Sequence, residues 1–380
     1  MKKFNGFNFK NKTVLLRCDF NVPISENGEV LDDFRIRKTI PTIKYLIEQN
    51  AKIILISHLE VKKKDLSLKY IIPKLNELLD KKVELLTDYL KADTKERIKE
   101  MSSDKIILLE NLRFYKEEKE NNQEFAKKIS ELADFFINEA FSVSHRNHAS
   151  IVSIPRYLPS TIGILFEKEL EVLSKVSENP ERPFVVILGG VKVQTKVKTI
   201  INLFEKSDYM LLGSKIGEAI LSQKGILTDR NFKEDESVAK IDIINLKIHL
   251  PLDGFIRPKD SKNHLRIGAI RTLKKEEDIY DIGPETIELF KEAISCAKTI
   301  LWNGPLGMYE DERFEKGTKE IAQAIAKNKS AFKVAGGGET IMAIDKFNLK
   351  NGFNFISTGG GAMLGFFAEQ ELPGIKALNS

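Results

Sequence analysis

The chain of 380 residues has little cysteine, histidine and tryptophan, and it lacks a long hydrophobic segment. Its two cysteines, Cys18 and Cys296, have no metal-site spacing, and we interpret both as buried thiols. The five histidines include no pair with the spacing of zinc ligands, so a structural zinc is not expected. No apolar run approaches the roughly 20 residues that cross a bilayer, and the N-terminus lacks the apolar core of a secretion signal. We therefore expect a cytoplasmic protein without a membrane partner.

The charges of the two signs are nearly balanced and are spread along the chain. There are 60 basic and 55 acidic side chains, which give a formal net charge of +5. Because there is no basic tail and no aromatic-basic surface pattern, we expect no nucleic-acid partner. A mildly basic cleft that binds an anionic small molecule explains the excess of basic side chains equally well.

Short apolar runs alternate with longer amphipathic stretches from one end of the chain to the other. Strands that are apolar throughout and separated by helices are typical of parallel sheets covered on both faces, so we predict an α/β fold. The length predicts about two domains. The expected strands cover residues 13–20, 51–57, 83–87, 105–110 and 135–141, then 184–190, 209–214, 299–305, 331–337 and 353–358.

Two triple-glycine turns near the C-terminus carry the strongest functional signal. Gly336–Gly338 and Gly359–Gly361 each follow a short apolar strand and precede a helical pattern. Glycines at such a position let the backbone approach a ligand closely, and the helix N-terminus favours negative charge. One such turn is as often a simple tight turn, but two in the same context indicate a polyphosphate site. Neither turn matches the Walker or the Rossmann glycine pattern.

Polar and cationic residues follow the expected strand ends in both halves. In parallel sheets ligands bind beyond the carboxyl ends of the strands. A lone arginine is usually part of a surface salt bridge, but arginines directly after apolar strands suit phosphate or carboxylate groups. The first half contributes Asp19, Asn21, Arg35, His58, Arg113 and Arg146. The second half contributes Lys192, Lys196, Asn303, Glu310 and Glu339. One half thus suits a small anionic substrate, and the other suits a nucleotide with its magnesium.

Ten collinear segments resemble the phosphoglycerate kinase family over nearly the whole chain. They include RCDFNVP, LLENLRF, FVVILGGVKV, LWNGPLGMYE, VAGGGET and STGGGAMLGFFAEQELPGIKAL. The resemblance implies reversible phosphoryl transfer from 1,3-bisphosphoglycerate to ADP, which gives 3-phosphoglycerate and ATP, with Mg²⁺ as cofactor.

The resemblance also implies a role for each matching residue. Asp19, Asn21, His58, Arg113 and Arg146 match positions that bind 3-phosphoglycerate, and Arg35 matches an arginine that also reaches the transferred group. Lys192 matches a lysine that follows the transferred group, and Gly360 and Gly361 match the helix start that faces it. The positions expected to bind nucleotide are Lys196, Asn303, Glu310, Gly336, Gly337, Gly338, Glu339 and Thr340, with Glu339 as the metal ligand.

The family fold implies two Rossmann-like three-layer domains with parallel sheets, which face each other across a cleft and are joined by a helix. We expect a substrate domain at residues 1–165, a linking helix and loop at 166–183, and a nucleotide domain at 184–366. The tail at residues 367–380 is expected to return to the first domain. We expect a monomer that closes about the linking segment, because the two clusters lie in different halves.

The sequence departs from the family pattern at several positions. Glu60 follows Ser57-His58-Leu59 where the family usually has Gly-Arg-Pro, so one substrate arginine is missing, and only Lys62–Lys64 offer a replacement. The magnesium turn has Glu339 in place of aspartate, the adenine-side segment at 212–217 has lost glycines, and Gly365 replaces an acidic residue. Two alternatives therefore remain beside the active enzyme: a catalytically impaired binding or regulatory protein, and a kinase for another small acid.

Overall fold

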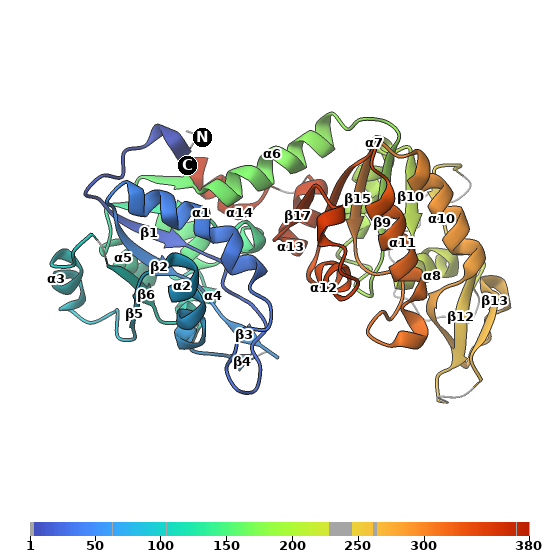
Figure 1. Cartoon of the computed structure of the whole chain (residues 1–380), viewed down its shortest axis with the longest axis horizontal. Coiled ribbons are helices and arrows are strands. Elements are labelled where there is room, and N and C mark those ends of the chain that lie inside the picture. The colour runs from blue at the N-terminus through green and yellow to red at the C-terminus, as the bar shows by residue number, and fades with distance from the viewer. Residues whose placement is uncertain are drawn as a thin grey trace. The chain divides into compact units, whose positions relative to one another are not determined.

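The computed structural model describes residues 4–62, 64–103, 105–227, 245–260, 264–369 and 371–379 (Figure 1). The chain divides into two compact units. Unit 1 comprises Met1–Glu171 and Glu371–Ser380, and unit 2 comprises Val172–Gln370. The division falls within helix α6 (Ile164–Glu178). Within the described part of the chain, no helix has the length and apolarity needed to span a bilayer.

Unit 1 is built on a six-stranded sheet in the order β5-β6-β2-β1-β7-β8, and all its neighbouring strands are parallel. The strands are β1 (Thr13–Arg17), β2 (Lys52–Ile56), β5 (Val83–Leu86), β6 (Ile106–Leu109), β7 (Phe135–Asn138) and β8 (Ser160–Ile162), and a ribbon is formed by β3 (Glu60–Val61) and β4 (Lys64–Asp65). The helices are α1 (Phe34–Glu48), α2 (Ile72–Leu79), α3 (Thr94–Lys99), α4 (Lys116–Lys119), α5 (Gln123–Ser130) and α14 (Pro373–Asn379). Short helical turns are η1 (Phe4–Gly6), η2 (Leu68–Ile71), η3 (Leu112–Phe114), η4 (Phe141–Val143), η5 (Ala149–Ser153) and η6 (Ile154–Arg156).

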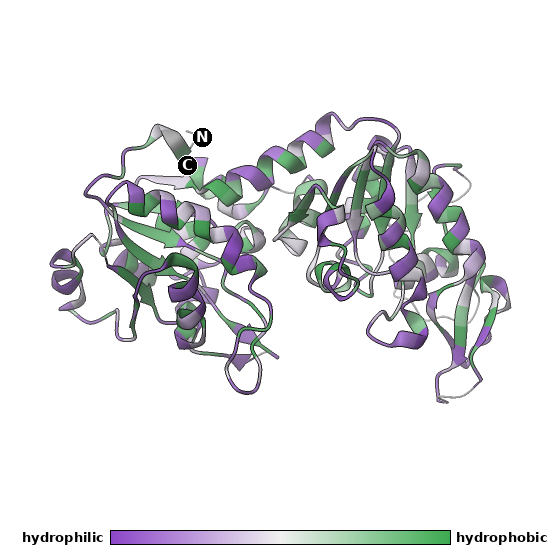
Figure 2. Cartoon of the chain, viewed as in Figure 1, coloured by the Kyte–Doolittle hydropathy of each residue, from purple (hydrophilic) through white to green (hydrophobic). Residues whose placement is uncertain are grey.

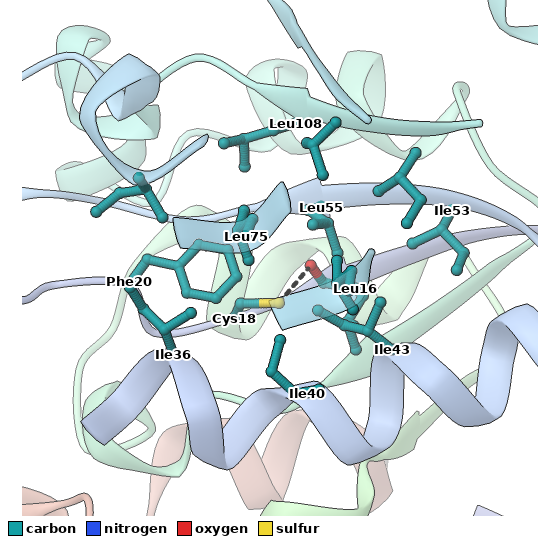
Figure 3. Close-up of a cluster of buried hydrophobic side chains, with 14 of the residues drawn as sticks. Leu16, Cys18, Phe20, Ile36, Ile40, Ile43, Ile53, Leu55, Leu75 and Leu108 are labelled. Atoms are coloured by element: carbon teal, nitrogen blue, oxygen red, sulfur yellow. Dashed lines mark hydrogen bonds between the residues drawn. The ribbon is translucent and has the colours of Figure 1, made fainter. Parts of the chain in front are cut away.

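The core of unit 1 occupies both faces of this sheet. Successive side chains of a strand point to opposite faces, so an apolar strand supplies two cores at once. Leu16 of β1 and Leu55 of β2 belong to one buried cluster, whereas Leu15 and Ile54 belong to the other. Figure 3 shows the first cluster, in which Ile36, Ile40 and Ile43 of α1 face the sheet at helical spacing.

Unit 2 has a second six-stranded parallel sheet, in the order β11-β10-β9-β15-β16-β17. Its strands are β9 (Phe184–Leu188), β10 (Tyr209–Leu212), β11 (Ile248–His249), β15 (Thr299–Asn303), β16 (Phe332–Gly336) and β17 (Phe355–Ser357). Its helices are α7 (Val197–Lys206), α8 (Ser214–Gln223), α10 (Pro284–Cys296), α11 (Lys316–Lys327), α12 (Gly338–Lys346) and α13 (Gly360–Phe367), with turns η7 (Ile270–Thr272), η8 (Glu312–Phe314) and η9 (Lys350–Gly352). In Figure 2 the strands of both sheets are largely green, and the helices alternate between purple and green.

The prediction of an α/β fold with two parallel sheets is confirmed, and each of the ten expected strands is present. Unit 2 also contains a three-stranded antiparallel sheet that the prediction missed, formed by β12 (Asp253–Pro258), β13 (Arg266–Ala269) and β14 (Glu277–Ile282). Its strands contain charged residues and exposed apolar side chains such as Ile267, so they lack a continuous apolar run. The interpretation of Cys296 as buried was wrong, because this thiol at the end of α10 is exposed, whereas Cys18 is buried.

A buried carboxyl group links the sheet of unit 1 to the start of α6. Glu139 directly follows β7 and is 1% exposed. Its two oxygens accept hydrogen bonds from the backbone N–H groups of Leu165 at 3.1 Å and Phe166 at 3.2 Å, and the Thr42 hydroxyl donates to it as well. These N–H groups belong to the first turn of the helix, where no helical partner exists. Glu139 therefore caps α6.

We expect Glu139→Ala to destabilise unit 1 by about 3 kcal/mol, because it leaves the N–H groups of Leu165, which is half-buried, and Phe166, which is buried, without acceptors. Urea unfolding followed by circular dichroism measures the shift. Glu171→Ala is the matched control in the same helix, since Glu171 is 67% exposed. Equal midpoints for the two variants would contradict the capping role.

Candidate active site

The residues predicted from the first half gather at one edge of the unit 1 sheet. Asp19 and Asn21 follow β1, His58 follows β2, and Arg113 lies in η3 after β6. Because β6, β2, β1 and β7 are neighbours in the sheet, their carboxyl ends bring these side chains together. Arg146 joins the same group from the chain after β7.

Asp19 and Asn21 hold Arg35 in place. The guanidinium of Arg35, in the first turn of α1, lies 3.2 Å from the Asp19 carboxylate and donates to the Asn21 carbonyl at 2.8 Å. The Ser142 hydroxyl also donates to Asp19. The side chain of Arg35 remains 25% exposed. This arginine is therefore oriented by its neighbours and still accessible to an anion.

A buried network that the sequence prediction missed lies beneath these residues. Arg17 is 1% exposed, and its guanidinium donates to the Ser150 hydroxyl at 2.9 Å and approaches His58 Nδ1 at 3.2 Å. Ser150 donates in turn to the buried carboxylate of Glu118 at 2.6 Å. Burial lowers the pKa of Arg17, and the Glu118 carboxylate opposes that shift. The network thus supplies a fixed cation and its counter-charge below the site.

The network also sets the protonation of His58. Burial, reinforced by the charges of Arg17 and Arg113, holds the pKa of His58 well below its ordinary value, so the imidazole is neutral. A guanidinium has no acceptor, so Nδ1 must accept from Arg17 and the proton must be on Nε2. His58 Nε2 is buried and has no hydrogen-bond partner among the described residues. It is therefore an N–H donor prepared for an anion.

Arg113 is already engaged by an acidic side chain of the β3–β4 ribbon. Its side chain is 3% exposed, and its guanidinium pairs closely with the Glu60 carboxylate and lies 4.0 Å from Asp65. Asn21 fixes Glu60 by accepting from its backbone N–H at 2.8 Å. Glu60, the residue that departs from the family pattern, therefore competes for an arginine expected to bind substrate.

The remaining basic residues near the ribbon differ in their exposure. Arg146 is partly buried, which lowers its pKa, and it lies close enough to Arg113, Asp19 and Glu60 to interact with their charges. Lys62 and Lys64 are exposed, and Lys63 lies outside the described residues.

The two triple-glycine turns of unit 2 lie against each other. β16 ends at Gly336 and β17 at Ser357, and these two residues are paired in the sheet. A Cβ added at Gly360 would lie 2.9 Å from the Cα of Gly337, which has a φ of +102°. Only glycine suits both positions, because one backbone passes close to the other and Gly337 is left-handed. The N-termini of α12 and α13 therefore open side by side.

Polar side chains fix the first of these turns, at Gly336, to the end of the neighbouring strand β15. The Asn303 amide donates to the Gly336 carbonyl at 2.8 Å, and the Thr340 hydroxyl accepts from the Gly304 N–H at 2.7 Å. Both side chains are buried. Their contacts in the structure are with protein backbone, so they shape the turns that would meet a phosphate.

Lys196 and Glu339 face each other beside the turns. A Cβ at Gly190 would lie 3.1 Å from Lys196 Nζ and 3.7 Å from Glu339 Oε2. Lys196 is 7% exposed, and its ammonium donates to the Gly189 carbonyl. Burial lowers the pKa of Lys196 to about 8, although the Glu339 carboxylate opposes this shift. Lys192 is exposed in the same loop, and its charge reaches Lys196.

A cavity of about 380 Å³ runs beside this group within unit 2. Glu310, the residue expected at the ribose, lines it and is exposed. Its lining also includes Gly190, Val191, Ser214, Lys215, Glu218, Leu221, Pro251, Ile270, Asp278, Ile279, Leu306, Met308 and Glu339. A largely apolar cavity that reaches Glu339, next to the glycine turns, is a candidate site for the apolar part of a ligand.

The side chains near the glycine turns could bind magnesium only together with a bound ligand. Among the described residues there is no group of three or more His, Cys, Asp or Glu side chains that could hold a metal ion. Mg²⁺, however, commonly binds through one or two carboxylates, with waters and substrate phosphates completing its shell. The exposed Glu339 carboxylate, next to the glycine turns, meets that requirement.

Comparison with known proteins finds relatives over nearly the whole chain. The sequence model of the family described as "Phosphoglycerate kinase" matches residues 4–370. The phosphoglycerate kinase of Dictyoglomus turgidum is 43% identical over 383 residues, which cover 97% of this chain and 96% of that protein. That of Borrelia hermsii is 39% identical and covers 100% of this chain and 99% of its own. The solved phosphoglycerate kinase from Pyrococcus horikoshii superposes with a TM-score of 0.88 at 34% identity and covers 100% of this chain and 98% of its own.

The pKa of Lys196 predicts how ADP affinity depends on pH. If Lys196 binds the phosphates of ADP, as the resemblance implies, it does so as the protonated amine, which predominates below a pKa of about 8 and is lost above it. We therefore expect ADP to bind about tenfold more weakly at pH 9 than at pH 7, as one protonation step requires. Calorimetric titration measures this, with Lys196→Arg as the non-titrating control. An ADP affinity that is the same at pH 7 and at pH 9 in the wild type would contradict a role of Lys196 in binding the phosphates.

Proposed function

This chain belongs to the phosphoglycerate kinase family, and we propose from that premise that the two groups of residues described above carry out its reaction. The protein is a phosphotransferase that moves a phosphoryl group reversibly between 1,3-bisphosphoglycerate and ADP. Unit 1 would bind the phosphoglycerate, and unit 2 would bind the nucleotide. The observation that carries this division is the pair of glycine turns lying side by side in unit 2, away from the arginine cluster in the sequence.

In unit 1 the bound acid would present two anionic ends to different residues. Arg113, Arg146 and the Nε2–H of His58 are donors suited to its phosphate. Asp19 and Asn21 would contact the carboxylate end and its hydroxyl. Arg35, accessible and held by Asp19, would reach the phosphoryl group that moves.

In unit 2 the cavity would hold the nucleoside, with Glu310 on the ribose. Lys196 and the N-termini of α12 and α13 would bind the phosphates. Glu339 would hold Mg²⁺ together with those phosphates, and the ion would neutralise part of their charge. The Gly360 and Gly361 N–H groups would face the transferred group.

The reaction depends on the positioning of the two substrates and on charge neutralisation more than on covalent catalysis. Toward ATP, an oxygen of the ADP β-phosphate attacks the phosphorus of the acyl phosphate, and the carboxylate leaves with the bonding electrons. Both oxygens are already anionic, so no proton moves and no general base is needed. Arg35 and Lys192 would stabilise the charge on the equatorial oxygens. Because the two substrates bind to different units, transfer requires that the units bring them together during the reaction.

The direct test supplies purified protein with 3-phosphoglycerate, ATP and Mg²⁺ and couples product formation to oxidation of NADH by glyceraldehyde-3-phosphate dehydrogenase. Turnover that requires all three components is the expected result. Binding of both substrates without turnover would instead identify an impaired relative. Turnover with a different small acid only would identify a different specificity.

We expect Lys192→Ala to lower kcat by about 100-fold or more while 3-phosphoglycerate still binds, because an exposed cation that meets the moving group acts mainly in the transition state. Steady-state kinetics and calorimetry measure the two effects. Lys198→Ala, also exposed and close in sequence, is the control. A variant that keeps more than about a tenth of the wild-type kcat would remove Lys192 from this role.

We expect Glu60→Gln to lower the KM for 3-phosphoglycerate about three- to tenfold, because the substrate phosphate no longer competes with a carboxylate for Arg113. The matched control is Glu77→Gln, which removes a carboxylate that pairs with Lys74 on α2. An unchanged KM would mean that separating Glu60 from Arg113 costs no free energy when the substrate binds.

A further inference from the structure

The cavity of unit 2 is bordered by the loop that carries Glu310. This loop runs from the end of β15 at Asn303 to the start of α11 at Lys316. The Glu310 carboxylate is exposed, and it makes no hydrogen bond or ion pair within the described part of the chain. Its position is therefore set by the backbone on either side of it.

Lys346, the last residue of α12, holds this loop on both sides of Glu310. Its ammonium donates to the Tyr309 carbonyl at 2.7 Å and lies 2.8 Å from the Glu315 carboxylate. Tyr309 directly precedes Glu310, and Glu315 is the N-cap of α11. The hydrogen bond from Lys346 lowers the pKa of Glu315, so this partner stays charged. Hydrogen bonds from a charged donor are roughly twice as strong as neutral ones.

Two further contacts of the loop lie farther from Glu310 along the chain. Before it, the Met308 N–H donates to the Tyr280 carbonyl at 2.8 Å. After it, the Phe314 ring stacks on the Tyr280 ring, with the ring centroids 4.8 Å apart. The hydrogen bond from Lys346 reaches the residue next to Glu310, so it constrains the Glu310 backbone more closely than either of them.

Helix α12 connects this loop to the phosphate turns. The helix begins at Gly338 and carries Glu339 in its first turn, and the seven residues from there to Lys346 rise by about 10 Å. The Tyr309 side chain is 3% exposed, and burial together with the charges of Glu310 and Glu339 raises its pKa to about 12. Tyr309 therefore lies near both carboxylates, and one helix joins the loop to the turns.

We propose that Lys346 is a positioning residue for nucleotide binding, which holds the loop so that Glu310 meets the ribose hydroxyls while the phosphates bind at the start of α12. This inference rests on the proposed nucleotide site of unit 2. Lys346 itself lies outside the lining of the cavity, so it acts on the nucleotide through the Tyr309 carbonyl.

Two nucleotides that differ only in the ribose hydroxyls measure this contact in the wild-type protein. ADP and 2′,3′-dideoxy-ADP are titrated calorimetrically with Mg²⁺ present, and the ratio of their Kd values reports the contribution of the hydroxyls. We expect the dideoxy nucleotide to bind about tenfold more weakly, the effect of a hydrogen bond to a charged group. A ratio near one would contradict the ribose role of Glu310 and would overturn this inference with it.

Lys346→Met tests the positioning role, because it keeps an apolar stem of similar length and removes the ammonium. We expect the ratio to fall to about two, while the Kd of the dideoxy nucleotide changes less than twofold. Lys346→Arg keeps a charged donor and should restore the ratio. Lys319→Met is the matched control, since Lys319 also pairs with Glu315, at 3.1 Å, and should leave the ratio unchanged.

Two outcomes for Lys346→Met would overturn the proposal. One is a ratio equal to that of the wild type. The other is equal weakening of both nucleotides, which would indicate a general structural role. Steady-state kinetics gives a second measure, because the ribose is remote from the transferred group: the KM for ATP should rise about fivefold while kcat changes less than twofold.

A double-mutant cycle tests whether Lys346 acts through Glu310. Glu310→Ala should bring the ratio close to one, and adding Lys346→Met should then change the ADP affinity no further. An additional loss of ADP affinity in the double variant would overturn the proposal.

The same variants separate this inference from the proposed function. Turnover of 3-phosphoglycerate and ATP, together with a ratio that Lys346→Met leaves unchanged, would support the enzyme and overturn the role of Lys346. A ratio that depends on Lys346, in a protein that turns over no substrate, would contradict the enzyme and support the role of Lys346.

Discussion

The direction of the strands is the constraint on which both candidate sites depend. In each unit every neighbouring pair of strands in the main sheet is parallel, so all carboxyl ends lie along one edge. Apolar strands such as β1 and β9 are buried on both faces and can carry polar function only where they end. Asp19 after β1 and Gly190 after β9 mark that point in units 1 and 2.

Electrostatics explains how a cluster of cations is tolerated before substrate binds. Arginines brought together repel one another, and burial raises the cost. Asp19 compensates Arg35, Glu60 compensates Arg113, and the buried Glu118 compensates Arg17 through Ser150. These carboxylates orient the arginines. Some of them must separate from their arginines for an anion to bind there. Under the proposed function, substrate affinity is therefore a difference between two sets of ion pairs.

Sequence reasoning predicted the strands and the family, because apolar runs and glycine turns are local signals. It could not predict contacts between residues far apart in the chain. Arg17 was visible within a strand, yet its partner Ser150 lies 133 residues away. The pairing of Glu60 with Arg113 was likewise hidden, although Glu60 stands out in the sequence as a departure from the family pattern. The roles expected for the site residues stay predictions, since the structure describes their neighbours without a ligand.

Hydrogen–deuterium exchange tests the central claim most directly, that each unit binds one substrate at the carboxyl edge of its sheet. With 3-phosphoglycerate alone, protection is expected in residues 17–22, 57–60, 110–115 and 141–148 of unit 1. With ADP and Mg²⁺ alone, it is expected in residues 188–197, 213–218, 303–310 and 336–340 of unit 2. Protection of the glycine turns by 3-phosphoglycerate, or of the arginine cluster by ADP, would contradict the account.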